Sequence, residues 1–88
     1  MKIKFTTNYQ TQLESIFSQA GYLVRYEKGN FNSGYCILNQ KKVVVVNKYY
    51  TTEGKINCLI DILRQVDWDF SQLEEKEKKL YEDIKKKS

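Results

Sequence analysis

The sequence predicts one α+β domain whose elements follow in the order α-β-β-β-α-α. Three observations predict this class. Apolar residues recur at helical spacing between residues 9 and 20 and again between residues 56 and 66. Between these two segments lie three runs of β-forming residues, separated by turn-forming residues. We expect all 88 residues to form a single domain, with a core at about residues 5–68 and a charged helix at about 71–87.

The first helix is predicted from its boundaries as well as its apolar stripe. Thr7 is followed by Gln10 at the spacing of a capping box, which places the N-cap at Thr7. Gly21 is suited to the left-handed residue that follows a helix. Before this helix, Met1, Ile3 and Phe5 alternate with polar residues, and a short strand is possible there.

The three strands are predicted to form an antiparallel meander. Gly29-Asn30 is a two-residue hairpin signal, which would place Val24 opposite Tyr35 and Arg25 opposite Gly34. A second turn at residues 39–42 leads to the valine run 43–46, which becomes an edge strand that something must cover or pair with.

The predicted pairing gives the sheet two different faces. One face is apolar throughout, and we expect it to pack against helices. The other is apolar at one end and polar at the other. The members of the apolar face are Tyr22, Val24, Tyr26, Tyr35, Ile37, Val44 and Val46, and those of the mixed face are Leu23, Arg25, Glu27, Asn32, Gly34, Cys36, Leu38, Val43 and Val45.

Two further helices are predicted after the sheet. Thr51 or Thr52 caps a helix that is apolar around most of its circumference, which predicts burial on more than one side. Ser71 and Glu74 have capping-box spacing and predict a helix that runs to about residue 86. Its apolar seam is thin, so it either packs weakly on the domain or pairs with another copy of itself.

Composition limits the compartment and the class of partner. No run of about 18 apolar residues occurs, and the first residues carry no apolar signal region, so we expect a cytoplasmic protein with reduced thiols and no membrane partner. Between residues 25 and 55 there are six basic and two acidic side chains, a balance of +4 that equals the net charge of the whole chain.

The absence of histidine excludes most hydrolytic and metal-dependent chemistry. Without it, the chain has no Ser-His or Cys-His nucleophile pair and no mixed Cys/His zinc site. The four glycines stand singly, so no glycine-rich phosphate loop is present. We therefore expect no cofactor, no metal and no conventional enzymatic activity.

Arg25 and Cys36 on the mixed face are the most suggestive chemical groups. Arg25 opposite Gly34 would border a shallow concavity together with Glu27 and Asn32, and arginine is suited to carboxylate or phosphate. The alternative is a solvated Arg25–Glu27 or Arg25–Asn32 contact, with Gly34 in a bulge. Cys36 would lie within reach of Arg25, which permits a thiol-dependent activity, but the sequence favours a small buried cysteine flanked by Leu23 and Val45.

A basic and aromatic segment supports a second alternative. Lysines that contact phosphates, beside aromatic rings that stack on bases, form single-stranded nucleic-acid surfaces. The residues that fit this pattern include Arg25, Lys28, Phe31 and Lys48. Several tyrosines of the segment, however, fall on the predicted core face.

The segments 24–31, 33–36 and 43–48 resemble a family of small bacterial proteins without an assigned activity, over about residues 21–63. The resemblance implies no activity. The order of strand, asparagine, loop and helix is also similar to that of minimal zinc metallopeptidases, whose apolar helix carries the metal ligands. Here the corresponding helix, residues 56–63, has no histidine, so this resemblance implies a scaffold without the metal chemistry.

Together these features predict a non-catalytic interaction domain that binds a protein partner or associates with itself as a homo-oligomer. The predicted contact residues are Arg25, Glu27, Lys28, Phe31, Asn32, Gly34, Cys36 and Lys48. Single-stranded nucleic-acid binding and a thiol-dependent activity at Cys36 are the alternatives.

Overall fold

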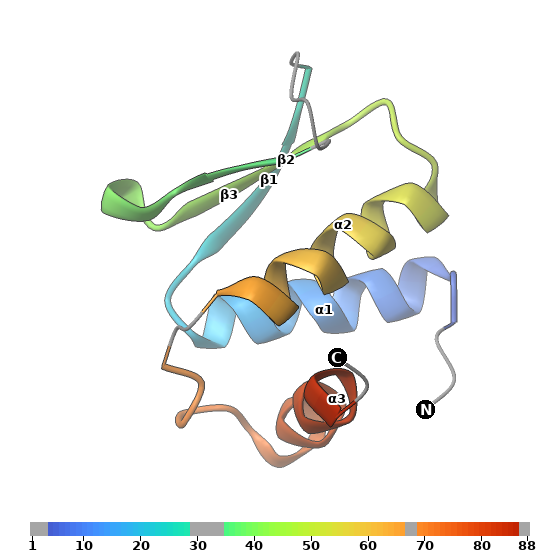
Figure 1. Ribbon diagram of the computed structural model, residues 1–88. Coiled ribbons are helices and arrows are strands. Elements are labelled where there is room, and N and C mark those ends of the chain that lie inside the picture. The colour runs from blue at the N-terminus through green and yellow to red at the C-terminus, as the bar shows by residue number, and fades with distance from the viewer. Residues whose placement is uncertain (1–3, 29–34, 67–68, 87–88) are drawn as a thin grey trace.

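The computed structural model describes residues 4–28, 35–66 and 69–86 and has an α+β architecture. A three-stranded sheet packs on α1 and α2, and α3 lies on the far side of that helix pair (Figure 1). The elements in chain order are α1 (Thr7–Gln19), β1 (Leu23–Glu27), β2 (Tyr35–Leu38), the 3-10 turn η1 (Asn39–Lys41), β3 (Val43–Asn47), α2 (Thr52–Gln65) and α3 (Glu75–Lys86). This order agrees with the predicted α-β-β-β-α-α.

Helix α1 begins one residue earlier than its sequence pattern indicated. The N-cap is Thr6, whose hydroxyl accepts a hydrogen bond from the backbone N–H of Tyr9 at 3.1 Å. Thr7 alone has a glutamine three residues on, but a threonine hydroxyl can cap a helix without that glutamine, and here the neighbouring Thr6 does so. The possible amino-terminal strand lies mostly outside the described residues, and Lys4 and Phe5 are not in a strand.

Gly21 ends α1 as expected, with a backbone φ of +88°. Replacing Gly21 with alanine is expected to destabilise the domain by about 1–2 kcal/mol, because a Cβ atom is disfavoured at positive φ. Urea denaturation measures the loss, with the exposed helical substitution Ser18→Ala as the control. An unchanged midpoint in the Gly21 variant would contradict the role assigned to this residue.

The last two helices begin differently from one another. Thr51 caps α2 by accepting from the N–H of Gly54 at 3.1 Å, as expected. The predicted start of α3 at Ser71 is wrong, because Ser71 instead donates through its N–H and hydroxyl to Asp69 Oδ1 at 3.0 and 2.6 Å. These bonds lower the pKa of the Asp69 carboxyl. The helix begins at Glu75, after the N–H of Glu74 has donated to the side-chain oxygen of Gln19 at 2.8 Å.

The sheet is mixed, and this corrects the predicted antiparallel meander. The strand order is β1-β3-β2, so β3 is central and pairs parallel with β1 and antiparallel with β2. Strands β1 and β2 are not neighbours, so the predicted pair Val24–Tyr35 does not form. Gly34, the predicted partner of Arg25, lies outside the described residues. The valine run was expected at an edge and instead lies between the other two strands. The Gly29-Asn30 turn itself lies outside the described residues.

For the described residues, the assignment of side chains to the two faces is nevertheless right. On the helix-covered face, Val44 lies between Val24 and Ile37, and Val46 lies between Tyr26 and Tyr35. Val44 and Val46 are fully buried, and their neighbours pack against the same core. The face survives the change of topology because side chains alternate along every strand, whichever strand lies beside it.

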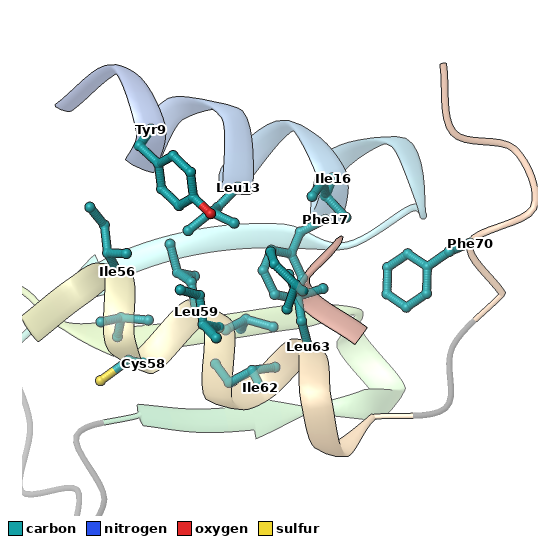
Figure 2. Close-up of a cluster of buried hydrophobic side chains, with 14 of the residues drawn as sticks. Tyr9, Leu13, Ile16, Phe17, Ile56, Cys58, Leu59, Ile62, Leu63 and Phe70 are labelled. Atoms are coloured by element: carbon teal, nitrogen blue, oxygen red, sulfur yellow. The ribbon is translucent and has the colours of Figure 1, made fainter. Parts of the chain in front are cut away.

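Helices α1 and α2 supply most of the core, and their apolar side chains meet beneath the sheet (Figure 2). Helix α3 closes the opposite side of the core through Ile84, which is fully buried. The thin apolar seam of α3 therefore packs on the domain. Before α3, the ring of Phe70 packs on that of Tyr81 with centroids 4.4 Å apart. The fully buried large side chains are Leu13, Ile16, Phe17, Val44, Val46, Ile56, Leu59, Ile62, Leu63 and Ile84.

One tyrosine from each edge strand connects the sheet to the helices. On β1, the hydroxyl of Tyr26 donates to Glu14 Oε2 at 2.5 Å, and Gln10 Nε2 donates to both groups, at 3.0 Å to the hydroxyl and 3.1 Å to the carboxylate. Such hydrogen bonds to charged groups are stronger than neutral ones. These hydrogen bonds among Tyr26, Glu14 and Gln10 orient α1 relative to β1.

A second cluster likewise contains a tyrosine, a carboxylate and a glutamine. On β2, the hydroxyl of Tyr35 donates to Asp61 Oδ2 at 2.8 Å and accepts from the side-chain amide of Gln65. In both clusters the carboxylate and the glutamine are four residues apart on one helix, so they lie on the same helix face. This cluster orients α2 relative to β2.

Candidate functional site

The sheet face opposite the helices is the surface that the fold leaves open. No helix or strand in the described part of the chain covers it (Figure 1). We call this surface the outer face. Its members are Leu23, Arg25 and Glu27 on β1, Val43, Val45 and Asn47 on β3, and Cys36 and Leu38 on β2.

The outer face is apolar at the end nearest the β2–β3 turn. Val43 lies between Leu23 and Leu38, of which Leu23 is 59% exposed and Leu38 is 38% exposed. Val45 lies between Arg25 and Cys36 and is only 7% exposed, although it does not belong to the main core. The exposed leucines of the outer face lie on the two edge strands.

Arg25 and Glu27 form an ion pair at the polar end of the outer face. Arg25 Nη2 lies 2.7 Å from Glu27 Oε2, and both side chains are substantially exposed. Among the described residues, Val45 is the one paired with Arg25. The predicted concavity over Gly34 falls outside the described residues. Phe31, Asn32 and Gly34 lie outside the described residues. A solvated pair of this kind contributes roughly 0–1 kcal/mol to stability.

Cys36 does not contact Arg25 in the way the hairpin predicted. The two residues lie on opposite edge strands with Val45 between them, so their backbones are separated by two strand spacings, about 9.5 Å. The Arg25 guanidinium is directed to Glu27. The predicted position of Cys36 beside Arg25 across a hairpin is therefore wrong, and the cysteine is a partly buried member of the outer face.

The basic side chains of the middle segment are divided between the two ends of the sheet. Lys41 and Lys42 lie at the β2–β3 turn, at one end of the sheet. Lys28 and Lys48 lie at the other end, where they follow the last residues of β1 and β3. Nζ of Lys48 lies 5.4 Å from the ring centroid of the exposed Tyr49. The described strand tyrosines, Tyr26 and Tyr35, face the helices, so the outer face presents aliphatic side chains in place of rings.

A groove of about 390 Å³ runs between β2 and α2 and was not expected from the sequence. It contains Tyr35, Cys58 and Asp61, and Figure 2 shows the Cys58 sulfur on the side of α2 away from α1. Burial, and then the charge of Asp61, raises the pKa of the Cys58 thiol. The sequence signal for this groove was the Asp61–Gln65 spacing, which resembles the Gln10–Glu14 pair on α1.

Comparison of the chain with known proteins gives no family to which it can be assigned. No protein-family model matches the sequence, and no curated protein or solved structure matches it. Within residues 4–28, 35–66 and 69–86, no helix is long and apolar enough to cross a membrane. In the same residues, no three of the metal-ligating His, Cys, Asp and Glu side chains come together.

Proposed function

We propose that this chain is a protein-interaction domain that associates with a second copy of itself through its three-stranded sheet. The observation that carries the proposal is the outer face, where Leu23 and Leu38 expose apolar side chains that the described helices leave uncovered. Exposed apolar side chains on an uncovered sheet are candidate contacts for a partner.

The charge of the outer face favours a second copy as the partner. Arg25 and Glu27 are its only charged members among the described residues, and they neutralise one another at 2.7 Å. Two such faces can therefore approach without a net charge penalty. A symmetric dimer requires this self-compatibility, because the same patch is used on both copies.

The size of the surface predicts a weak and reversible association. Three strands about 4.8 Å apart, each rising about 3.3 Å per residue, present a face of roughly 250 Å². A stable interface buries about 800 Å² on each partner. We therefore expect self-association at high protein concentration and monomers at low concentration.

Sedimentation velocity over a concentration series tests the proposal. The weight-average mass is expected to rise with concentration for the wild-type chain, and Leu38→Lys is expected to weaken association at least tenfold by placing a charge on the outer face. Phe5→Lys is the control, because Phe5 is also exposed but lies outside the sheet. A chain that stays monomeric at near-millimolar concentration would contradict the proposal.

Single-stranded nucleic-acid binding is a second candidate because Lys48 and the 68% exposed Tyr49 lie together at one end of the sheet. Stacking on such a ring beside a cation is how single strands are held without sequence preference. Fluorescence anisotropy of a labelled thymidine oligonucleotide measures it. Binding that weakens steeply with salt and is reduced by Tyr49→Ala would support this function, and the absence of binding at low salt would exclude it.

A further inference from the structure

We infer that the second copy binds along strand β2, on the side away from β3, and that the two β2 strands pair antiparallel about a two-fold axis at Ile37. This inference rests on the proposed self-association and specifies its contact. The result is one sheet that continues from the first copy into the second.

The two edges of the sheet differ in how they resist pairing. Strand β1 carries Arg25 and Glu27, and charged side chains discourage a second strand from docking at an edge. Strand β2, Tyr35–Leu38, carries no charged residue and no proline. Within residues 4–28, 35–66 and 69–86, β2 is therefore the edge strand that carries no charged side chain.

The backbone of Ile37 is directed toward this edge. The N–H of Leu23 donates to Lys42 O at 2.9 Å and the N–H of Lys48 donates to Glu27 O at 3.1 Å, so the even-numbered residues of β3 direct their backbone groups to β1. By alternation, Val43 and Val45 direct theirs to β2, where they face Leu38 and Cys36. Between those two residues, Ile37 directs its N–H and C=O away from β3.

A two-fold axis at Ile37 lets the two copies exchange backbone hydrogen bonds. The N–H of Ile37 in each copy donates to the C=O of Ile37 in the other, as in the hydrogen-bonded pairs of an antiparallel ladder. Cys36 then lies opposite Leu38 of the second copy on the outer face, with Cα atoms about 4.5 Å apart. Each such cross-strand pair contributes roughly 0.2–1 kcal/mol.

Charge complementarity supports the antiparallel arrangement. Lys41 lies just beyond one end of β2 and lines an apolar hollow of about 300 Å³ with Ile37 and Leu38. Asp61 lies at the other end, where it accepts the hydrogen bond of Tyr35. Antiparallel pairing brings Lys41 of each copy to the Asp61 end of the other, so two attractive contacts form, one at each end.

The first experiment compares lysine substitutions on the two edge strands by sedimentation velocity. Cys36→Lys is expected to weaken dimerisation at least tenfold, because it places a charge on strand β2. Leu23→Lys is the matched control on the same face but on β1, and it is expected to change the dissociation constant less than twofold. Circular dichroism verifies that both variants are folded.

Lys41→Glu tests the charge contact. It is expected to weaken dimerisation, because a carboxylate then lies at the Asp61 end of the second copy. Lys78→Glu, on α3 and away from the sheet, makes the same change in net charge and is expected to have little effect. Equal effects of the two substitutions would overturn the Lys41–Asp61 contact.

The outcomes separate the inference from the proposed function. If Leu23→Lys dissociates the dimer as strongly as Cys36→Lys, the copies associate through their outer faces. Self-association would then stand, and the β2 edge would be excluded as the contact. If the wild-type chain remains monomeric, both proposals fall.

A disulfide experiment tests the register directly. In Leu38→Cys, the new thiol should face Cys36 of the second copy, and oxidised glutathione should couple these two thiols while it is itself reduced to two glutathione molecules. In the wild type, the two Cys36 Cα atoms would be roughly 8 Å apart, beyond the usual limit for a disulfide. Cys58→Ser is included in both backgrounds so that only the intended thiols react.

Peptide mapping reads out the register. A covalent dimer linked between positions 36 and 38 supports the axis at Ile37. A wild-type dimer linked between the two Cys36 residues, or no linkage in the Leu38→Cys chain at concentrations where it dimerises, would overturn it.

Discussion

Replacing Leu59 with alanine is expected to cost about 2–5 kcal/mol of the free energy of unfolding. Leu59 is fully buried on α2 and faces α1 beneath the sheet (Figure 2). The loss combines the removed apolar contacts with a cavity that the two helices cannot close. A domain of this length has a total stability of roughly 4–13 kcal/mol, so the substitution removes a large part of it.

Urea denaturation followed by circular dichroism measures this loss. Leu59→Met keeps the volume nearly constant and is the matched control, with an expected cost below about 1.5 kcal/mol. A loss in Leu59→Ala no larger than that of Leu59→Met would mean that α1 and α2 pack less tightly than the burial of this residue implies.

The second large effect is a loss of stability at alkaline pH. Burial, and then the hydrogen bond donated to Glu14, raises the pKa of Tyr26 above its ordinary value of 10.0. Burial also raises the pKa values of Tyr9 and Tyr35 above that value. The folded state therefore holds these protons more tightly than the unfolded state does. The stabilisation is fully present below about pH 10 and is lost as the pH rises above it toward the folded pKa, by at most about 1.4 kcal/mol per pH unit for each tyrosine.

Tyr26→Phe isolates the largest of these contributions. The free energy of unfolding, measured by denaturant titration from pH 8 upward, is expected to fall less steeply above pH 10 in this variant than in the wild type. At neutral pH the variant is expected to be less stable by about 1–2 kcal/mol, because Glu14 loses a hydrogen bond. If the free energies of unfolding of the two proteins fell in parallel above pH 10, Tyr26 would have the same pKa in the folded and unfolded states, which would contradict this prediction.

The sequence predicts the helices and the sheet faces because both depend on local periodicity. Alternation along β1 and β3 places Val24 and Val44 inward and Arg25 outward, whatever the strand order. The strand order itself depends on which edges meet, and no local pattern determines that. The hairpin signal at Gly29-Asn30 favoured pairing of consecutive strands, although the valine run, apolar on both faces, is also typical of a central strand.

The candidate site was predictable in composition but not in arrangement. Leu23, Cys36 and Leu38 were placed together on the mixed face, and the structure brings them to its two edges. Arg25 could not be placed beside Val45 without the parallel pairing of β1 with β3. The groove containing Cys58 and Asp61 was missed because it forms only where α2 passes the edge of β2.

The central position of β3 also has a consequence for the order in which the sheet is assembled. Strands β2 and β3 are joined by a short turn and can form a hairpin as soon as both have been synthesised. Strand β1 precedes both but must wait for β3, and its parallel pairing closes a loop of 20 residues between Leu23 and Val43. Closing the longer loop costs more chain entropy. We expect the hairpin to be the nucleus onto which β1 docks late, and β1 to be the first strand to detach when the domain opens.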